Sequence, residues 1–233
     1  MSYNKFFLLI FLLCLIFVTC YPLVYENIKI VLGKTNLSSL NNDEFKEVFQ
    51  IQAISEDIKN KISGLSWKEG CPVKIDSLRY VIVTYWGFDD KPHTGELIIN
   101  EKVADEVMDI FKELYVGKYP IDKIKLIDYY NANDNEAMMD NNTSAFCFRE
   151  KPNSTELSVH SFGMCIDINP VQNPYVKGDV ILPSIGEDFL VRSTARKGMI
   201  TQDDLCYKAF TSRGWSWGGD WINLKDYQHF EKN

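Results

Sequence analysis

The chain has 233 residues, of which 45% are hydrophobic and 24% are charged. This composition is typical of a folded domain with one sizeable apolar core, and it excludes collagen-like and intrinsically disordered chains. Lys and Arg total 25 against 32 Asp and Glu, which gives a formal net charge of −7. Because nucleic-acid binding depends on basic surfaces, this balance argues against DNA or RNA as a partner.

Histidine and cysteine, the residues most used for metal binding and redox chemistry, are few in this chain. The three histidines are His93, His160 and His229, so any metal site or histidine-based catalysis has to use them. Of the six cysteines, Cys14 and Cys20 lie in the apolar N-terminal segment. No C-x-x-C pair occurs, which excludes a zinc knuckle and a thioredoxin-type redox motif.

Residues 1–25 have the pattern of an export segment. Lys5 is followed by a purely apolar run over residues 6–18, and the next charge is Glu26. A cleaved signal peptide and an uncleaved membrane anchor both fit this pattern. Acylation at Cys20 is a third alternative, although the residues before it are larger than lipoprotein processing usually favours. In each case we expect the rest of the chain to work outside the cytoplasmic membrane.

The next elements in chain order are a tether, short helices and a hairpin. Residues 26–65 begin polar and rich in Asn and Ser, which predicts a tether, and continue with apolar residues at roughly helical spacing. Residues 78–88 are rich in β-branched and aromatic types, and residues 96–100 follow a turn-forming stretch. The pattern predicts one or two short helices and then a β-hairpin with a loop of about six or seven residues.

A stripe of apolar residues at helical spacing predicts the next helix; it consists of Val103, Val107, Ile110, Phe111 and Leu114. Gly117 and Pro120 end this helix. Residues 124–130 and 162–169 are expected to be strands, and residues 205–213 a short helix. This order predicts an α+β domain over residues 66–233, with a small, mostly antiparallel sheet flanked by helices.

Two segments, residues 158–170 and 217–231, concentrate polar groups where a strand pattern would predict core. If the chain is extended around Asp167, its carboxylate points away from the face of Ile166 and Ile168. His160 precedes it by seven residues and His229 follows 62 residues later. Catalytic zinc takes imidazole and carboxylate ligands from three protein residues and keeps a fourth position open. Spacing alone is weak evidence for such a site.

The two segments also resemble a known family. Residues 158–169 fit the motif S-x-H-x-x-G-x-x-x-D-I-N, and residues 217–230 contain W-G-G-D-W followed by D-x-x-H-F. They resemble the zinc D-alanyl-D-alanine carboxypeptidase and L-alanyl-D-glutamate endopeptidase family of bacterial cell walls and phage endolysins. That family shares its fold with the vancomycin-resistance D,D-dipeptidases and the hedgehog signalling domain. Four further stretches look like the family: residues 66–73, 93–100, 141–149 and 173–176.

The resemblance implies a hedgehog/D,D-peptidase-like fold and one zinc ion per chain. It places His160, Asp167 and His229 at the metal-ligand positions, and Asp226 at the position of the catalytic carboxylate. Arg149 falls at the position of an arginine that binds substrate and the developing oxyanion.

Several of these residues could instead have ordinary structural roles. Arg149 could form a surface ion pair with Glu150 or Glu156. Ser158 could bind substrate or cap the turn before His160. His93 is expected in the hairpin and is not assigned to the metal.

Three further expectations concern residues near the motifs or elsewhere in the chain. Aspartate at position 226 favours the endopeptidase branch, because the dipeptidase branch has glutamate there. Asp220 is expected to brace the loop before His229. A disulfide between Cys71 and Cys147 is conceivable, but the sequence gives no distance between them.

The expected function is hydrolysis of a peptide bond in the peptidoglycan stem, as a carboxypeptidase or an endopeptidase. The expected partners are stem peptides, with the membrane contacted through the N-terminal segment, and the chain is expected to be a monomer. The location follows as the extracellular face of the cytoplasmic membrane or the cell wall. A catalytically silent, zinc-stabilised cell-wall binding module of the same fold is the alternative.

Overall fold

The computed structural model describes residues 45–151 and 154–232. The predicted signal or anchor, residues 1–25, lies outside this part of the chain, as does most of the predicted tether. Among the described residues, no helix is long and apolar enough to cross a bilayer. The compact unit that carries all described residues except Phe45 begins at Lys46.

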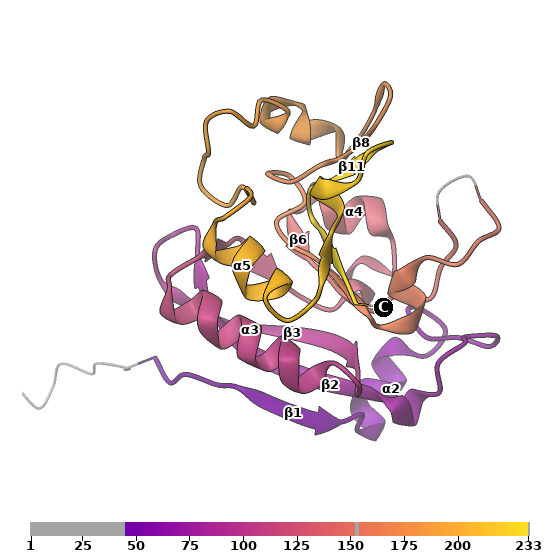
Figure 1. Ribbon diagram of the computed structural model, residues 1–233. Coiled ribbons are helices and arrows are strands. Elements are labelled where there is room, and N and C mark those ends of the chain that lie inside the picture. Colours follow the sequence, from indigo (N-terminus) through magenta and orange to yellow (C-terminus); the bar gives the residue numbers. More distant parts are fainter. Residues whose placement is uncertain (1–44, 152–153, 233) are drawn as a thin grey trace, which may run out of the picture. The chain divides into compact units, whose positions relative to one another are not determined.

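A four-stranded sheet forms the N-terminal part of this unit (Figure 1). Its strands are β1 (Gln50–Ala53), β2 (Leu78–Gly87), β3 (Pro92–Asn100) and β4 (Pro120–Ile121). The central strand β2 pairs antiparallel with β1 and β3, and β4 joins it in parallel. The predicted hairpin is confirmed, but β3 begins earlier than expected because residues from Pro92 onward already pair with β2. The connecting turn is therefore only residues 88–91.

Helix α3 (Ala104–Val116) lies across this sheet (Figure 1) and confirms the predicted apolar stripe. Val107, Ile110 and Phe111 are fully buried against the strands. Each buried side chain of this kind contributes about 1.5–3 kcal/mol. The helix ends at Gly117, where an added Cβ would lie 2.2 Å from Leu205 of the neighbouring helix α5 (Leu205–Thr211).

The segment before the hairpin differs from its prediction. Helical spacing predicts one or two short helices within residues 43–62; helix α2 (Glu56–Ile62) confirms one, but strand β1 precedes it. The short sequence of β1 pairs along the edge of β2, so tertiary pairing overrides the local pattern there. Ser55 caps α2 by accepting a hydrogen bond from the Ile58 amide. Both elements belong to the compact unit, whereas the sequence pattern predicts that the catalytic domain begins only at residue 66.

The middle of the chain is built from short elements. Strands β5 (Lys123–Ile124) and β6 (Asn142–Thr143) pair in parallel, and helix α4 (Asp134–Met139) lies between them in sequence. The predicted strand over residues 124–130 is wrong beyond β5, because the chain turns into a 3-10 helix, η3 (Ile127–Tyr130). The cause lies in Asp128, whose carboxylate accepts hydrogen bonds from the amide and hydroxyl of Ser66.

Two three-stranded sheets form the C-terminal part. One has the order β10-β12-β7 and consists of β10 (Ser216–Trp217), β12 (His229–Glu231) and β7 (Cys165–Asp167). The other has the order β11-β8-β9 and consists of β11 (Lys225–Asp226), β8 (Tyr175–Lys177) and β9 (Val180–Leu182). The remaining 3-10 helices are η2 (Ile75–Ser77), η4 (Val159–Phe162), η5 (Ser184–Phe189) and η6 (Gly218–Asp220). The strand predicted at residues 162–169 is confirmed only over β7, because Phe162 still belongs to η4. The helix predicted at residues 205–213 is confirmed as α5.

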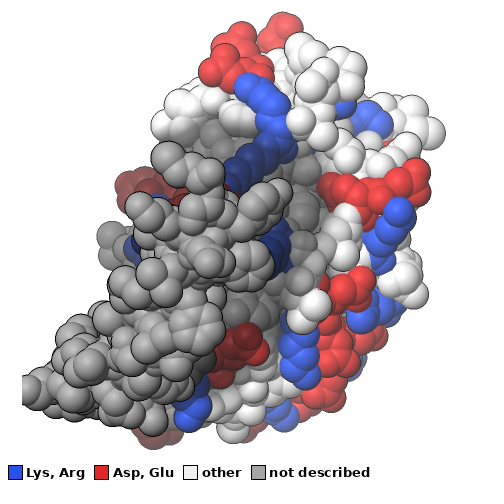
Figure 2. Space-filling model, turned by 90° about the vertical axis from the view of Figure 1, so that its left-hand side faces the viewer, with Lys and Arg blue, Asp and Glu red and all other residues white. Residues whose placement is uncertain are grey.

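The α+β class is thus confirmed, with several small, mostly antiparallel sheets in place of one. Within the uncovered part of the face in Figure 2, acidic and basic side chains are interspersed.

Candidate functional site

Strands β7 and β12 present a polar face built from residues far apart in the sequence. Their antiparallel register places His229 opposite Asp167 and Glu231 opposite Cys165. The intervening residues, Ile166 and Phe230, are fully buried in the apolar core on the other face. Because side chains alternate along a strand, one pair of strands supplies both the core and the site.

Asp167 lies between two imidazoles. Its Oδ2 is 3.0 Å from Nε2 of His160, and its Oδ1 is 2.8 Å from Nδ1 of His229. All three side chains are buried. A tetrahedral ion with bonds of 2.0–2.1 Å places its ligand atoms about 3.3 Å apart. The two contacts use different carboxylate oxygens and are somewhat shorter than this value, so they show that the three groups are adjacent and that their ligand types suit a metal ion.

The second nitrogen of each imidazole is held by a separate acceptor. Nδ1 of His160 contacts the carbonyl oxygen of Ala145, and Nε2 of His229 lies 3.2 Å from the Glu231 carboxylate. Such partners fix the ring orientation and leave the other nitrogen's lone pair free for a metal. Sequence reasoning missed Glu231; its signal is the position two residues after His229, on the same face of the strand.

The chain around Asp167 and His160 is fixed by backbone hydrogen bonds and a tight turn. Ser144 exchanges two backbone hydrogen bonds with Asp167, of 2.9 and 3.1 Å. Gly163 ends η4 in the left-handed conformation with φ of +65°, and an added Cβ there would lie 2.8 Å from the Asn100 amide nitrogen. The turn can therefore place His160 beside Asp167 only with glycine at this position.

A thiol lies in the same cluster. Potential ligand atoms of His160, Cys165 and His229 all lie within 4.8 Å of one another, and all three residues are buried. The two histidines are therefore shared by two possible ligand sets, one completed by Asp167 and one by Cys165. The cysteine was not among the predicted site residues; its signal is the position two residues before Asp167 on β7.

The electrostatics of the cluster favour a buried cation. Burial by itself raises the pKa of Asp167, but His160 and His229 hold it well below its usual range. Burial opposes the charge on His229, yet hydrogen bonds to Asp167 and Glu231 raise its pKa to about 10. The metal-free protein therefore keeps a proton on His229 at neutral pH, at the place where a metal ion would supply the positive charge.

Asp226 lies on β11 at the same cleft and is half-buried, with its Oδ1 atom shielded from solvent. Its Oδ1 has no hydrogen-bond partner among the described residues. Burial raises the pKa of its carboxyl group; His229 opposes this shift, while Asp167 adds to it. Gly218 permits the close approach of the strand, since an added Cβ would lie 2.5 Å from the Asp226 carbonyl oxygen. A buried carboxyl group with a free oxygen is suited to accept and release a proton.

Arg149 reaches the cleft from the segment before η4. Its guanidinium forms an ion pair of 2.8 Å with Asp134 at the start of α4, so neither predicted partner, Glu150 nor Glu156, is the one observed. Ser161 fixes its backbone by accepting from the Arg149 amide and donating to its carbonyl oxygen. Its Nε is buried without a partner among the described residues. The side chain therefore has a donor available for a bound group.

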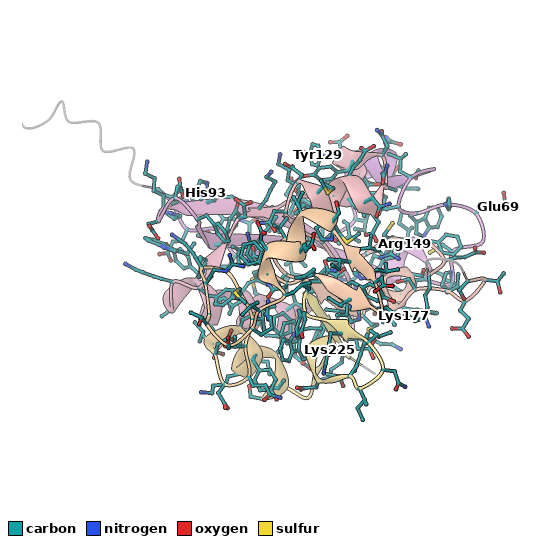
Figure 3. The ribbon with its side chains drawn as sticks, turned by 90° about the horizontal axis from the view of Figure 1, so that it is seen from above. Glu69, His93, Tyr129, Arg149, Lys177 and Lys225 are labelled. Carbon is teal, nitrogen blue, oxygen red and sulfur yellow. The ribbon has the colours of Figure 1, made fainter. Side chains whose placement is uncertain are left out.

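The other predicted residues have structural contacts. The Ser158 hydroxyl accepts a hydrogen bond of 3.3 Å from the His160 amide, which is the capping role. Asp220 contacts Gln202 and Tyr207, so it braces the loop as expected. His93 pairs with Asp89 and lies far from the labelled Arg149 in Figure 3. The four described cysteines are free, which does not support the disulfide between Cys71 and Cys147.

Arg149, Asp226 and the His160, Asp167 and His229 cluster line one cleft of about 920 Å³. Apolar and aromatic side chains form part of its wall: Tyr175, Val180, Leu182, Trp221 and Leu224. Arg149 and Lys177 also line it, and Figure 3 shows both on the same side of the molecule. The cleft therefore combines an apolar wall, the cationic side chains of Arg149, Lys151 and Lys177, and the His-Asp-His cluster.

A known protein family matches the part of the chain that carries most of this cleft. The model of the D-alanyl-D-alanine carboxypeptidase family matches residues 152–232. These residues are therefore similar to the D-alanyl-D-alanine carboxypeptidase family. The resemblance inferred from the two motifs is thereby confirmed. No curated protein and no solved structure matches the chain.

The segment that matches the family model contains most of the site. Both motifs lie within it, together with Ser158, Asp226 and the three residues of the His-Asp-His cluster. Arg149 lies immediately before the matched residues, and its place in the cleft comes from the structure alone. The sheet with α3 lies outside the match.

Proposed function

We propose that the chain is an exported zinc peptidase that hydrolyses a peptide bond in the stem of peptidoglycan. The single observation that carries this proposal is the buried His160, Asp167 and His229 cluster inside the family-matched segment, facing a cleft with Asp226. The proposed domain arrangement is an N-terminal signal or anchor, a tether, and a catalytic domain. Its proposed fold is that of the hedgehog and D,D-peptidase group.

The donor set suits zinc. Two imidazole nitrogens and a carboxylate oxygen are the ligand types of catalytic zinc sites, which keep one position open. Bound zinc supplies Lewis acidity and activates a water molecule as the nucleophile. The contacts of Ala145 and Glu231 with the outer nitrogens hold each ring in the tautomer that a metal needs.

Asp226 is proposed as the general base. Its unpartnered, buried oxygen can take the proton of the attacking water and then deliver it to the leaving amine. The raised pKa of its carboxyl group brings its proton affinity closer to that required near neutral pH. A positioned acid–base group of this kind contributes about 10²- to 10⁴-fold to the rate.

Arg149 is proposed to bind the substrate carbonyl or carboxylate and to stabilise the negative charge of the tetrahedral intermediate. The guanidinium already pairs with Asp134, which fixes its direction, and its free Nε remains available to a ligand. Loss of one such donor typically costs about 3 kcal/mol in the activation barrier. Because Ser158 caps η4, any contact that it makes with substrate would be additional to that role.

Two cleavage specificities remain within the proposal: removal of a C-terminal D-alanine, and cleavage between L-alanine and D-glutamate. Aspartate rather than glutamate at position 226 favours the endopeptidase, by resemblance to that branch of the family. A catalytically silent binding module would need only the metal ligands. The unpartnered Oδ1 of Asp226 and the available donor of Arg149 are better explained by catalysis.

The test uses the full chain, purified in mild detergent, loaded with zinc and incubated with muropeptides. Mass spectrometry is expected to show shortened stem peptides and to identify the bond that is cut. We expect Asp226→Asn to lower kcat by about 10²- to 10⁴-fold with zinc content unchanged. His229→Ala should instead lose the metal.

Asp220→Asn is the matched control, because it changes a carboxylate nearby in the same part of the chain that contacts Gln202 and Tyr207. It should retain activity. If zinc is bound but no stem peptide is shortened, or if Asp226→Asn is as active as Asp220→Asn, the proposed enzyme is wrong.

A further inference from the structure

Cys165 is a fully buried thiol that the proposed mechanism does not use. It occupies β7 two residues before Asp167, so both side chains project from the same face of the strand. The strand's register also sets Cys165 opposite Glu231, next to His229. The sulfur therefore belongs to the polar face of the strand pair and not to the apolar core beneath it.

The surroundings of this sulfur contain metal-binding groups. Potential ligand atoms of His160, Cys165 and His229 lie within 4.8 Å of one another. No hydrogen bond among the described residues involves the Cys165 sulfur, so no protein partner competes for it. Thiolate binds zinc at about 2.3 Å and imidazole at about 2.0 Å, which makes this a chemically coherent donor set.

We propose that Cys165 is a further metal ligand of this centre, binding a thiophilic ion through Sγ together with His160 and His229. The inference rests on the proposed function only in its assumption that a metal ion occupies this cluster. With such an ion the sulfur takes the place that the Asp167 carboxylate takes in the other ligand set, so a fourth coordination position stays open. A site of this composition favours softer ions more than one with only nitrogen and oxygen donors.

Cobalt(II) is a direct probe of sulfur ligation. Full-length protein in detergent is stripped with a chelator and titrated with Co²⁺, whose visible absorption reports tetrahedral binding. We expect a near-ultraviolet thiolate-to-cobalt charge-transfer band in the native chain and its loss in Cys165→Ser. Cys165→Ala provides a second variant without any side-chain oxygen, should the serine hydroxyl disturb folding or bind the ion.

Cys206→Ser is the matched control. Its thiol is equally buried, but it lies on α5 and is absent from the metal cluster. This variant should keep the charge-transfer band. Cobalt bound to the native chain without the band, or a band that persists in both Cys165 variants, would overturn the inference.

Competition between Cd²⁺ and Zn²⁺ gives a second measurement. Because cadmium prefers sulfur more strongly, Cys165→Ala should lose more affinity for Cd²⁺ than for Zn²⁺. Equal losses, or none, contradict sulfur ligation.

The results separate the two proposals. Failure to bind any cobalt removes both the metal site and this inference. Tetrahedral cobalt without a charge-transfer band removes only the inference, and cleavage of muropeptides is measured independently of either spectrum.

Discussion

The sheet under α3 and the C-terminal site are organised in opposite ways. Strands β2 and β3 have ten and nine residues and bury an almost entirely apolar face against α3. The strands that carry the site have two or three residues and are joined by loops. The first region owes its stability to buried apolar area, whereas the second depends on specific polar contacts.

Asparagine side chains show how the second region is held. Asn173 donates to the carbonyls of Ile168, Asn169 and Gly198 and accepts from the Ile200 amide. Such bonds satisfy the backbone groups of loops that would otherwise be buried without partners. The difference between the regions teaches that stability and metal affinity can be altered separately.

The largest expected effect is on stability, from Phe111→Ala in α3. Removing a fully buried aromatic ring should lower the free energy of unfolding by about 3–5 kcal/mol, through lost burial and the cavity left behind. Urea denaturation of the zinc-loaded protein measures this change. Val116→Ala, on the same helix but 80% exposed, should change it by less than about 0.5 kcal/mol.

The fraction of Phe111→Ala protein that remains folded should still bind zinc with the same stoichiometry as the unchanged chain. If Phe111→Ala weakens zinc binding in the folded protein as strongly as it lowers stability, the two regions are not independent.

In contrast to Phe111→Ala, Glu231→Gln should weaken zinc binding and leave the stability of the fold nearly unchanged. It keeps the shape of the side chain but removes the charged acceptor of His229 Nε2, and loss of such a partner typically weakens metal binding about 10- to 100-fold. Zinc competition with a chromophoric chelator measures the affinity. Glu113→Gln removes the same charge from a half-exposed pair with Arg213 and should leave the affinity unchanged. Equal affinities in the two variants would refute the role of Glu231.

The smallest expected effect is the change in zinc affinity for each unit of pH. The folded-state pKa of His229, raised to about 10, lies above its ordinary 6.5, so the metal-free protein gains stability below pH 6.5 and loses it as the pH rises through 10. A metal must displace this proton, so zinc affinity should rise about tenfold per pH unit between about pH 6 and 8. Calorimetry in buffers of different ionisation enthalpy measures the proton released. Affinity independent of pH would show that His229 is neutral before the metal binds.

The two regions also differ in how far their sequence predicts them. The apolar stripe of α3 and the alternation of β2 are local patterns, and local patterns specify these elements because one face is buried. Strand β1 has no such signal, since pairing with β2 decides its conformation. A non-local contact also limits β5: the hydrogen bond between Asp128 and Ser66 holds the following residues in a 3-10 helix, so the predicted strand ends early.

The candidate site was predictable where a motif carries it and not where the fold assembles it. His160, Asp167 and His229 stand in two motifs, and the structure brings them together. Asp134 approaches Arg149 only because α4 packs there, so its place in the cleft required the fold. Glu231 lies beside a motif residue, but its contact depends on strand geometry.

The register between β7 and β12 has a consequence for how this chain can change in length. A single residue inserted into either strand would turn Ile166 or Phe230 toward the cleft and bury the groups that now face it. The 61 residues that separate Asp167 from His229 include loops that tolerate insertions, because such loops leave this register intact. Lineages of this protein should therefore differ in loop length between the two strands while keeping each strand free of insertions and deletions.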